Sequence, residues 1–323
     1  MIKKRENILL FFLFLFSIYS ALNIGQSWDQ DAELLKGKVT IDYLFSLGKI
    51  DKDIFYREYY SSIYLSLQYL ITKIFPSEYE IQVSHLVNLF FSLTTIFGIS
   101  KICKIVFNKK VGKIAFLVLF FYPIFFGHMG FNSKDTILAF SHVWITYLAI
   151  EYLRIQDNKE KRLRNIVYIG ILLAVGTGIQ LVFLGSLLPI ILFIFLEIFF
   201  FKKFICKTFN HKKFLFDLIK CFLVFYSLLI LFWIDAYPNI FLLPFDFLMS
   251  TFESNYITGW CCNLVNGNYY FSSEVPKFYF LTNFIYKSPE YLLICYVLFI
   301  IFLINSKNFL MKKFKYFSSK IYF

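Results

Sequence analysis

Long apolar runs, separated by short lysine-rich segments, constrain this chain more than any other feature of its sequence. A helix made from such a run is apolar on every side and needs lipid around it. The chain is 59% apolar and 22% aromatic, well above the roughly 45–50% apolar share of soluble domains. The pattern predicts an all-α integral membrane protein. The runs are 8–21, 81–100, 114–127, 136–153, 166–199, 214–234 and 291–304.

The lengths of the runs predict the number of crossings. Run 166–199 has 34 residues and four glycines, more than the ~20 residues of one crossing, so we expect a hairpin of two spans. The first run follows a basic segment, as in a signal peptide, but Ile18 and Tyr19 stand where cleavage needs small residues. We therefore expect a retained span. The sum is about eight transmembrane helices in a single transmembrane domain, 1–323.

Basic residues are concentrated in alternate segments between the runs. With the N-terminus inside, the cytoplasmic segments hold 24 of the 33 Lys and Arg and 6 of the 21 acidic residues, whereas the external segments hold 9 and 15. Lys and Arg gather on the cytoplasmic side of membrane proteins, so both termini are predicted to be cytoplasmic. The external parts of interest are loop 22–80, turn 128–135 and loop 235–290.

Some functions are not indicated. The net charge is +12, which by itself would suit a nucleic-acid partner. The lysines, however, lie between hydrophobic runs and not on one face with stacking aromatics, so we expect no nucleic-acid partner. The chain has no Gly-rich phosphate loop, HExxH or GxSxG motif. No metal ligand is assigned from the sequence.

The first external loop offers carboxylates and an aromatic cluster. Asp29 and Asp31 follow the first span closely, where they can accept protons. Arg57 and Tyr60 lie in the aromatic segment 55–60, which suits a phosphate or a sugar and equally suits anchoring at the membrane interface. Apolar residues at helical spacing in 63–74 predict an amphipathic juxtamembrane helix that lies on the membrane and ends before Pro76.

The turn 128–135 carries more polar groups than a short external connection needs. They are His128, Asn132, Lys134 and Asp135, and ionisable residues at a membrane edge are functional candidates. A structural interpretation stays open, in which Asn132 caps the next helix and Asp135 lies in its first turn. The late tract 266–279, with Tyr269 and Lys277, suits carbohydrate or a membrane-interface belt.

In these three segments the chain resembles the bacterial polyprenyl-phosphate-dependent glycosyltransferases of the GT-C fold, a group related to the protein mannosyltransferases of family 39 and to aminoarabinose transferases. The family pattern has an acidic pair after the first span, a GH-x-x-x-N-x-K-D turn after the third, and a late NG-x-Y tract. The turn is matched by Gly127, His128, Asn132, Lys134 and Asp135. The usual Asp-Glu pair reads Asp29-Gln30, with Asp31 one place later.

The resemblance implies an inverting sugar transfer at the outer face of the cell inner membrane. The donor is a polyprenyl-phosphate-linked sugar, and the acceptor is a hydroxyl of an unknown glycan, lipid or protein. The implied catalytic residues are Asp29, as general base, with Asp31 and Asp135. The implied substrate-binding and phosphate-binding residues are Arg57, Tyr60, His128, Asn132, Lys134, Tyr269 and Lys277.

The role of Asp135 stays open, because it either orients Lys134 or holds a divalent cation with His128. We favour orientation, since hard cations usually gather more carboxylates than this turn supplies. Two other functions also stay open. A transporter or flippase of lipid-linked sugars would use the same basic and aromatic residues without chemistry, and a non-catalytic membrane assembly protein would carry the external acids as solvated charge.

Overall fold

The computed structural model describes residues 2–49, 61–205, 209–250, 263–271 and 274–305. The described part is helical except for one antiparallel hairpin, β1 (Asn263–Val265) and β2 (Asn268–Tyr270), in which Asn263 pairs with Tyr270. Its α-helices are α1 (Ile2–Asn23), α2 (Gln30–Phe45), α3 (Ile63–Thr72), α4 (Glu80–Val106), α5 (Lys109–Phe120), α6 (Pro123–His128), α7 (Asp135–Arg154), α8 (Lys159–Ile179), α9 (Phe183–Ser186), α10 (Leu188–Leu196), α11 (His211–Leu231), α12 (Leu242–Ser250), α14 (Tyr279–Lys287) and α15 (Glu290–Asn305). Short 3₁₀ turns η1 (Ser77–Tyr79) and η3 (Ile234–Asn239) and a π-helical turn η2 (Glu197–Phe201) complete it.

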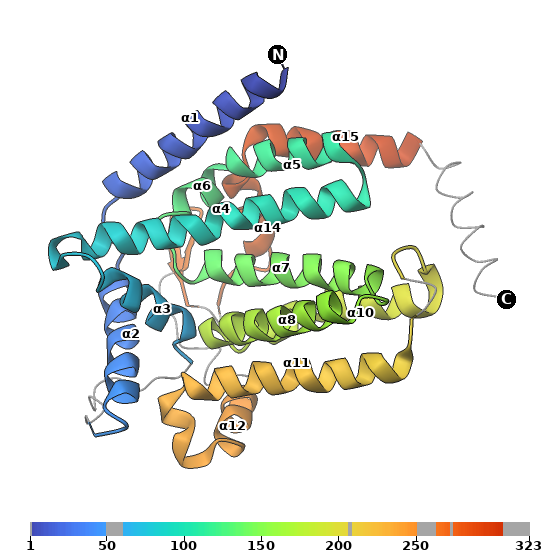
Figure 1. The fold of residues 1–323 in the computed structure, drawn as a ribbon. Coiled ribbons are helices and arrows are strands. Elements are labelled where there is room, and N and C mark those ends of the chain that lie inside the picture. Colours follow the sequence, from blue (N-terminus) through green and yellow to red (C-terminus); the bar gives the residue numbers. More distant parts are fainter. Residues whose placement is uncertain (1, 50–60, 206–208, 251–262, 272–273, 306–323) are drawn as a thin grey trace.

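The long helices form a row in the order α5, α4, α7, α8 and α11, each packed on the next (Figure 1). Helices α2 and α3 close one end of this row, the left end in Figure 1, where α3 contacts both α4 and α8. The α6–α7 and α8–α9 connections lie at the same end, and the α4–α5, α7–α8 and α10–α11 connections lie at the opposite end. The two ends therefore carry different sets of loops.

Five helices in the described ranges are long and apolar enough to cross a membrane, and six if the bent pair α14 and α15 counts as one span. This fold is compatible with an integral membrane protein. The five are Ser77–Val106, Asp135–Arg154, Lys159–Ile179, Phe183–Phe201 and His211–Leu231. The predicted spans 81–100, 136–153 and 214–234 each lie in one of these candidate helices, and run 166–199 is divided between two of them.

The other three predicted spans are not confirmed, for different reasons. The apolar part of α1 is Asn7–Asn23, 17 residues, and α14 meets α15 at 115°. Run 114–127 is two helices, because α5 ends at Phe120 and the chain is extended at Tyr122 before Pro123 starts α6. Proline favours a helix start and disfavours helical backbone in the residue before it. A count of eight spans is therefore not established.

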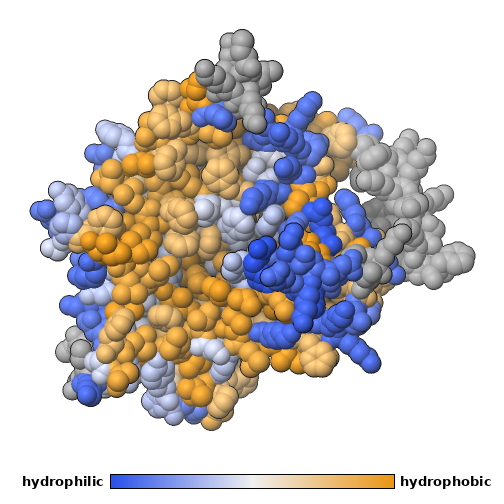
Figure 2. Space-filling model, viewed as in Figure 1, coloured by the Kyte–Doolittle hydropathy of each residue, from blue (hydrophilic) through white to orange (hydrophobic). Residues whose placement is uncertain are grey.

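The end of the row that holds the α4–α5, α7–α8 and α10–α11 connections is strongly hydrophilic (Figure 2). Each helix that starts there is capped in the same way. The side chains of Asn108, Asn158 and Asn210 accept hydrogen bonds from backbone N–H groups in the first turns of α5, α8 and α11. Between the two ends, Figure 2 shows a broad band of apolar side chains.

A buried ion pair joins three helices near this hydrophilic end of the row, which we call the basic end. The guanidinium of Arg162 on α8 donates to the carboxylate of Asp217 on α11, and Tyr152 of α7 donates its hydroxyl to the same carboxylate at 2.9 Å. The two charged side chains are 7% and 1% exposed. Since removing one member of a buried pair leaves an uncompensated charge, the packing of α7, α8 and α11 requires both members of this pair.

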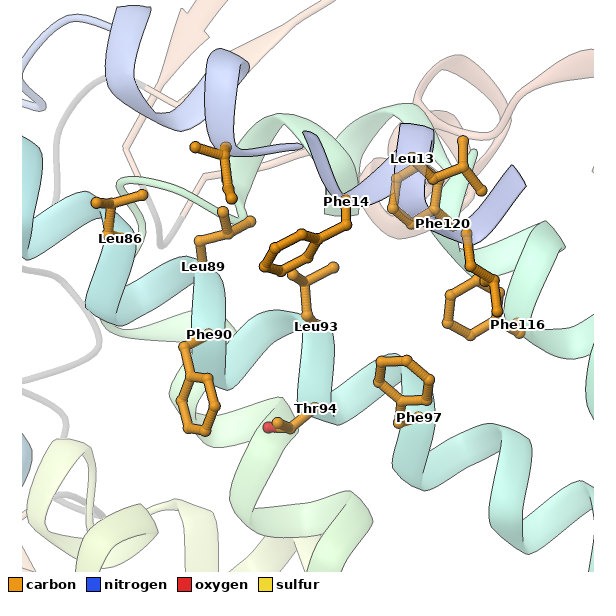
Figure 3. Close-up of a pocket in the computed structure, with 12 residues that line it drawn as sticks. Leu13, Phe14, Leu86, Leu89, Phe90, Leu93, Thr94, Phe97, Phe116 and Phe120 are labelled. Atoms are coloured by element: carbon orange, nitrogen blue, oxygen red, sulfur yellow. The ribbon is translucent and has the colours of Figure 1, made fainter. Parts of the chain in front are cut away.

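A second feature beside α4 is an apolar cleft against α1 and α5. A cleft of about 360 Å³ lies between α1, α4 and α5, and Figure 3 shows Phe14, Leu93 and Phe116 pointing into it from these three helices. Of its lining side chains, all but Thr94 are apolar. The cleft offers van der Waals contacts and almost no hydrogen bonding.

The predicted amphipathic segment 63–74 does form a helix, α3, but its buried face includes several polar side chains. Ser66, Gln68 and Thr72 are buried, whereas Leu67, Leu70 and Ile74 of the apolar stripe are exposed. The amide of Gln68 donates to the hydroxyl of Ser84 on α4 at 2.8 Å. Helix α3 thus turns its hydrogen-bonding groups toward α4.

Candidate functional site

Lys134, just ahead of α7, forms two ion pairs with carboxylates of the first external loop. Its ammonium lies 2.8 Å from Oδ2 of Asp29 and 3.4 Å from Oε1 of Glu33. Asp29 directly precedes α2 and Glu33 lies one turn into it, so both carboxylates face the turn. The other oxygen of Glu33 accepts a hydrogen bond from the hydroxyl of Ser133. The site therefore joins segments about a hundred residues apart in the chain.

Asn132 gives the turn its shape. Its side-chain oxygen accepts hydrogen bonds from the backbone N–H groups of Lys134 (3.1 Å) and Asp135 (2.8 Å). Its amide nitrogen donates to the carboxylate of Asp135 at 3.0 Å and to Nδ1 of His128 at 2.7 Å. Asn132 thus has the capping role that the sequence left open. Its side-chain amide and one ring nitrogen of His128 are occupied by hydrogen bonds within the turn.

A row of polar side chains on α4 forms hydrogen bonds with the backbone of the turn. Asn88 donates to the carbonyl oxygens of Met129 and Asn132 at 3.0 and 3.1 Å, and Ser92 donates to that of Met129. The hydroxyls of Tyr64 and Thr136 in turn donate to the side-chain oxygen of Asn88. Because these groups are buried and satisfied, they fix the turn against α4.

The residue at the second position of the expected acidic pair faces α4. Gln30 is 3% exposed, and its side-chain oxygen lies 3.0 Å from Nε2 of His85, whose other nitrogen lies 3.0 Å from the carbonyl oxygen of Ala21. His85 is thus a hydrogen-bonded core residue. A charge at position 30 would be buried here, whereas Glu33 brings a carboxylate to the site.

The site is electrostatically coupled. Burial raises the pKa of Glu33, and the hydrogen bond from Ser133 and the charge of Lys134 only partly oppose this effect. Partial burial acts against the ammonium of Lys134, but the hydrogen bonds and charges of Asp29 and Glu33 outweigh it, so the pKa of Lys134 is raised. Lys134 is therefore a stable cation, and Glu33 is more easily protonated than a carboxyl group in water.

Two pockets open on either side of Lys134. One, of about 360 Å³, is lined by Asp29 and the turn, and the other, of about 220 Å³, lies toward α3 and the end of α8. Lys134, Glu33 and Asp135 line both. We call them the turn pocket and the α8 pocket. A ligand in either one meets the same cation.

The structure brings together only part of the predicted set. Asp29, Lys134 and Asp135 line the turn pocket. Asp31 lines neither pocket among the described residues and accepts a hydrogen bond from exposed Gln26. The predicted residues Arg57 and Tyr60 lie outside the described ranges, and Tyr269 and Lys277, both exposed, are absent from the described lining of the two pockets.

Two residues of the site were missed by the sequence reasoning, Glu33 and Lys36, because α2 was not predicted as a helix. The spacing from Asp29 to Glu33, four residues, places both acids on one helical face and was the available signal. Within the described ranges, no group of three or more His, Cys, Asp or Glu side chains is arranged to hold a metal ion.

Comparison with models of protein families, with curated proteins and with solved structures finds no match to this chain. The assignment of a function thus depends on the site.

Proposed function

We propose that the protein is a membrane glycosyltransferase that moves a sugar from a polyprenyl-phosphate-linked donor to an acceptor hydroxyl. One observation carries the proposal: Lys134 lies between two carboxylates and two pockets, at the edge of a bundle of apolar helices. A cation beside a proton acceptor is what the transfer of a sugar from a phosphate needs. The resemblance of the turn to the GH-x-x-x-N-x-K-D pattern of the GT-C glycosyltransferases supports the same reaction.

In the proposed reaction, the acceptor oxygen attacks the anomeric carbon while the bond from that carbon to the phosphate oxygen breaks. The bonding electron pair stays on the phosphate, and the ammonium of Lys134 stabilises the added charge. Asp29, whose side chain is 59% exposed, takes the proton of the attacking hydroxyl. Asp135, held by Asn132 at 3.0 Å, is a positioning residue for the turn.

The membrane orientation is part of the proposal. We place the α2–α7 site outside and the asparagine-capped ends of α5, α8 and α11 inside, with both termini cytoplasmic. Since α4 ends at the basic end and α7 begins at the site, α5 and α6 carry the chain back between them (Figure 1). Counting α1, the α5–α6 pair and the α14–α15 pair as crossings gives the eight predicted spans.

Reporter fusions test this orientation. Fusions after Lys110, Lys161 and Lys213 should report cytoplasm, and a fusion near Lys49 should report the outside. A cytoplasmic signal near Lys49 would overturn the external site.

A transporter of lipid-linked sugars is the main competing function, and it needs polar groups along a path through the helices. The row on α4 has such groups, but Asn88 and Ser92 bind the turn, and His85 binds Gln30 and Ala21. They position the site and line no described pocket. This favours chemistry at the membrane edge.

The test of the enzyme proposal compares Asp29→Asn, Asp31→Asn and the double variant in one membrane preparation. The donor probe is the polyprenyl-phosphate-linked sugar fraction extracted from cells that lack the protein. Asp29→Asn should lower sugar transfer about 10²–10⁴-fold, the usual contribution of a positioned base, without loss of donor binding. Asp31→Asn, which is outside both pockets, serves as the matched control. Parental transfer by the double variant would refute the assignment of the base.

A further inference from the structure

The α8 pocket is built by the close approach of three segments. Lys36 of α2, Ser61 just ahead of α3, and Gln180 after α8 line it together with Lys134. The approach depends on a missing side chain: a Cβ at Gly178 would lie 2.9 Å from the carbonyl oxygen of Ser61. The pocket is therefore a specific product of how α8 meets the start of α3.

Ser61 brings an unsatisfied hydroxyl to this pocket. The residue is 3% exposed, and its Oγ has no hydrogen-bond partner among the described residues. Its neighbour Ser62 is bonded to Thr40 at 2.6 Å and to the carbonyl oxygen of Phe232. A buried hydroxyl without a partner is costly, so Ser61 is poised to bond with a ligand that enters the pocket.

The two lysines of the α8 pocket differ in whether they form ion pairs. Lys134 is paired with Asp29 and Glu33, whereas Lys36, half-buried, forms no ion pair within the described part of the chain. Asp135, the second acid of the lining, is bonded to Asn132. The lining of the pocket thus combines a lysine outside the described ion pairs with the hydroxyl of Ser61, a combination that favours an anion.

An apolar groove begins one helical turn from this pocket. It measures about 400 Å³ and lies between α3, α4, α7 and α8. Along α8 the groove reaches Val175 and the pocket starts at Gly178, and along α3 the groove reaches Ile63 beside Ser62 of the pocket. Its other walls include Phe91, Phe140 and Trp144. A ligand that uses both places must be an amphiphile.

We propose that the α8 pocket binds the phosphate of a polyprenyl phosphate through Lys36, Ser61 and Lys134, both as the sugar-linked diester of the donor and as the monoester that transfer leaves, while the chain lies in the groove between α3, α4, α7 and α8. This assignment rests on the proposed function and deepens it. It puts the phosphate side of the donor in the α8 pocket and the acceptor in the turn pocket. Lys134 then stands at the boundary between them, where the bond breaks.

The experiment measures binding of a polyprenyl monophosphate to the purified full chain in phosphatidylcholine nanodiscs. Lys36→Ala should weaken binding about 10- to 100-fold, the loss of a charge-assisted contact, and Ser61→Ala about 2- to 10-fold. Lys38→Ala, an exposed lysine of the same helix that is outside the pocket lining, is the matched control and should bind like the parent. Ser61→Ala should keep or raise the unfolding midpoint, because the hydroxyl it removes is unsatisfied.

The outcomes separate this inference from the transferase proposal. No binding by the parent chain, or equal binding by Lys36→Ala, Ser61→Ala and the parent, overturns the pocket assignment whatever the sugar-transfer assay shows. Weakened binding in both variants supports it even if no sugar is transferred, and that result would count against the transferase alone. Inorganic phosphate competing as strongly as the polyprenyl monophosphate would overturn the role of the groove.

Discussion

Two charged clusters lie at opposite ends of α7, and they differ in what surrounds them. At its start, Lys134 is 52% exposed and adjoins two pockets; at its other end, Arg162 and Asp217 are 7% and 1% exposed, and neither lines a described pocket. Lys134 has a flexible ammonium that can exchange partners, whereas Arg162 has a planar guanidinium whose donors are held in a fixed arrangement. The two clusters thus differ in burial and in access to a ligand, and we call the first the open cluster and the second the closed cluster.

The largest expected effect breaks the closed cluster. Asp217→Ala leaves the guanidinium of Arg162 buried without its carboxylate, which should lower the free energy of unfolding by about 3–5 kcal/mol. Thermal unfolding of the purified protein in detergent measures it. Lys220→Ala is the control, because its ammonium is 3.9 Å from Asp217 and 54% exposed, and it should cost less than about 1 kcal/mol. Equal stability of the two variants would contradict a clamp.

A smaller effect on binding is expected at the open cluster. Lys134→Ala removes one partly desolvated charge-assisted contact with the phosphate, which should weaken donor binding by about 1.5–3 kcal/mol. Lys110→Ala, at the basic end, should leave donor binding unchanged. If purified Lys134→Ala bound the polyprenyl-phosphate donor as tightly as the parent, the turn would be a helix cap and the two clusters would both be structural.

The smallest effect is a dependence of stability on pH. Burial raises the pKa of Glu33 above its ordinary value of 4.5, so the folded protein holds this proton more tightly than the unfolded chain does. Its contribution to stability is full below pH 4.5 and is lost as the pH rises through the folded pKa. Glu33→Gln does not titrate.

The unfolding midpoint of the parent minus that of Glu33→Gln should therefore fall as the pH rises from 4.5. A difference that stays constant or grows with pH would show that Glu33 is not held in a buried environment.

The sequence predicted the helices better than their contacts. Runs such as 136–153 are apolar on all sides, so composition and length sufficed, and the glycines of 166–199 correctly marked a hairpin. The polar residues of the turn were singled out, including Asn132, whose capping bonds are local. The contact of Glu33 with Ser133 spans a hundred residues, and no local pattern specifies it.

Helix α3 shows the same limit. Its apolar stripe predicted which residues share a face, but the packing of Gln68 and Ser66 against α4 and its neighbours decided which face is buried. Predicting that orientation required the polar row on α4, which a single apolar run does not reveal.

The most direct test of the central claim, that the open cluster cleaves a sugar from a lipid phosphate, is the lipid extract of cells in which the gene carries Asp29→Asn. A polyprenyl-phosphate-linked sugar should accumulate there and in cells without the gene, while Asp31→Asn cells should match the parent. If neither the Asp29→Asn cells nor those without the gene accumulated such a lipid, the account of the site would be contradicted.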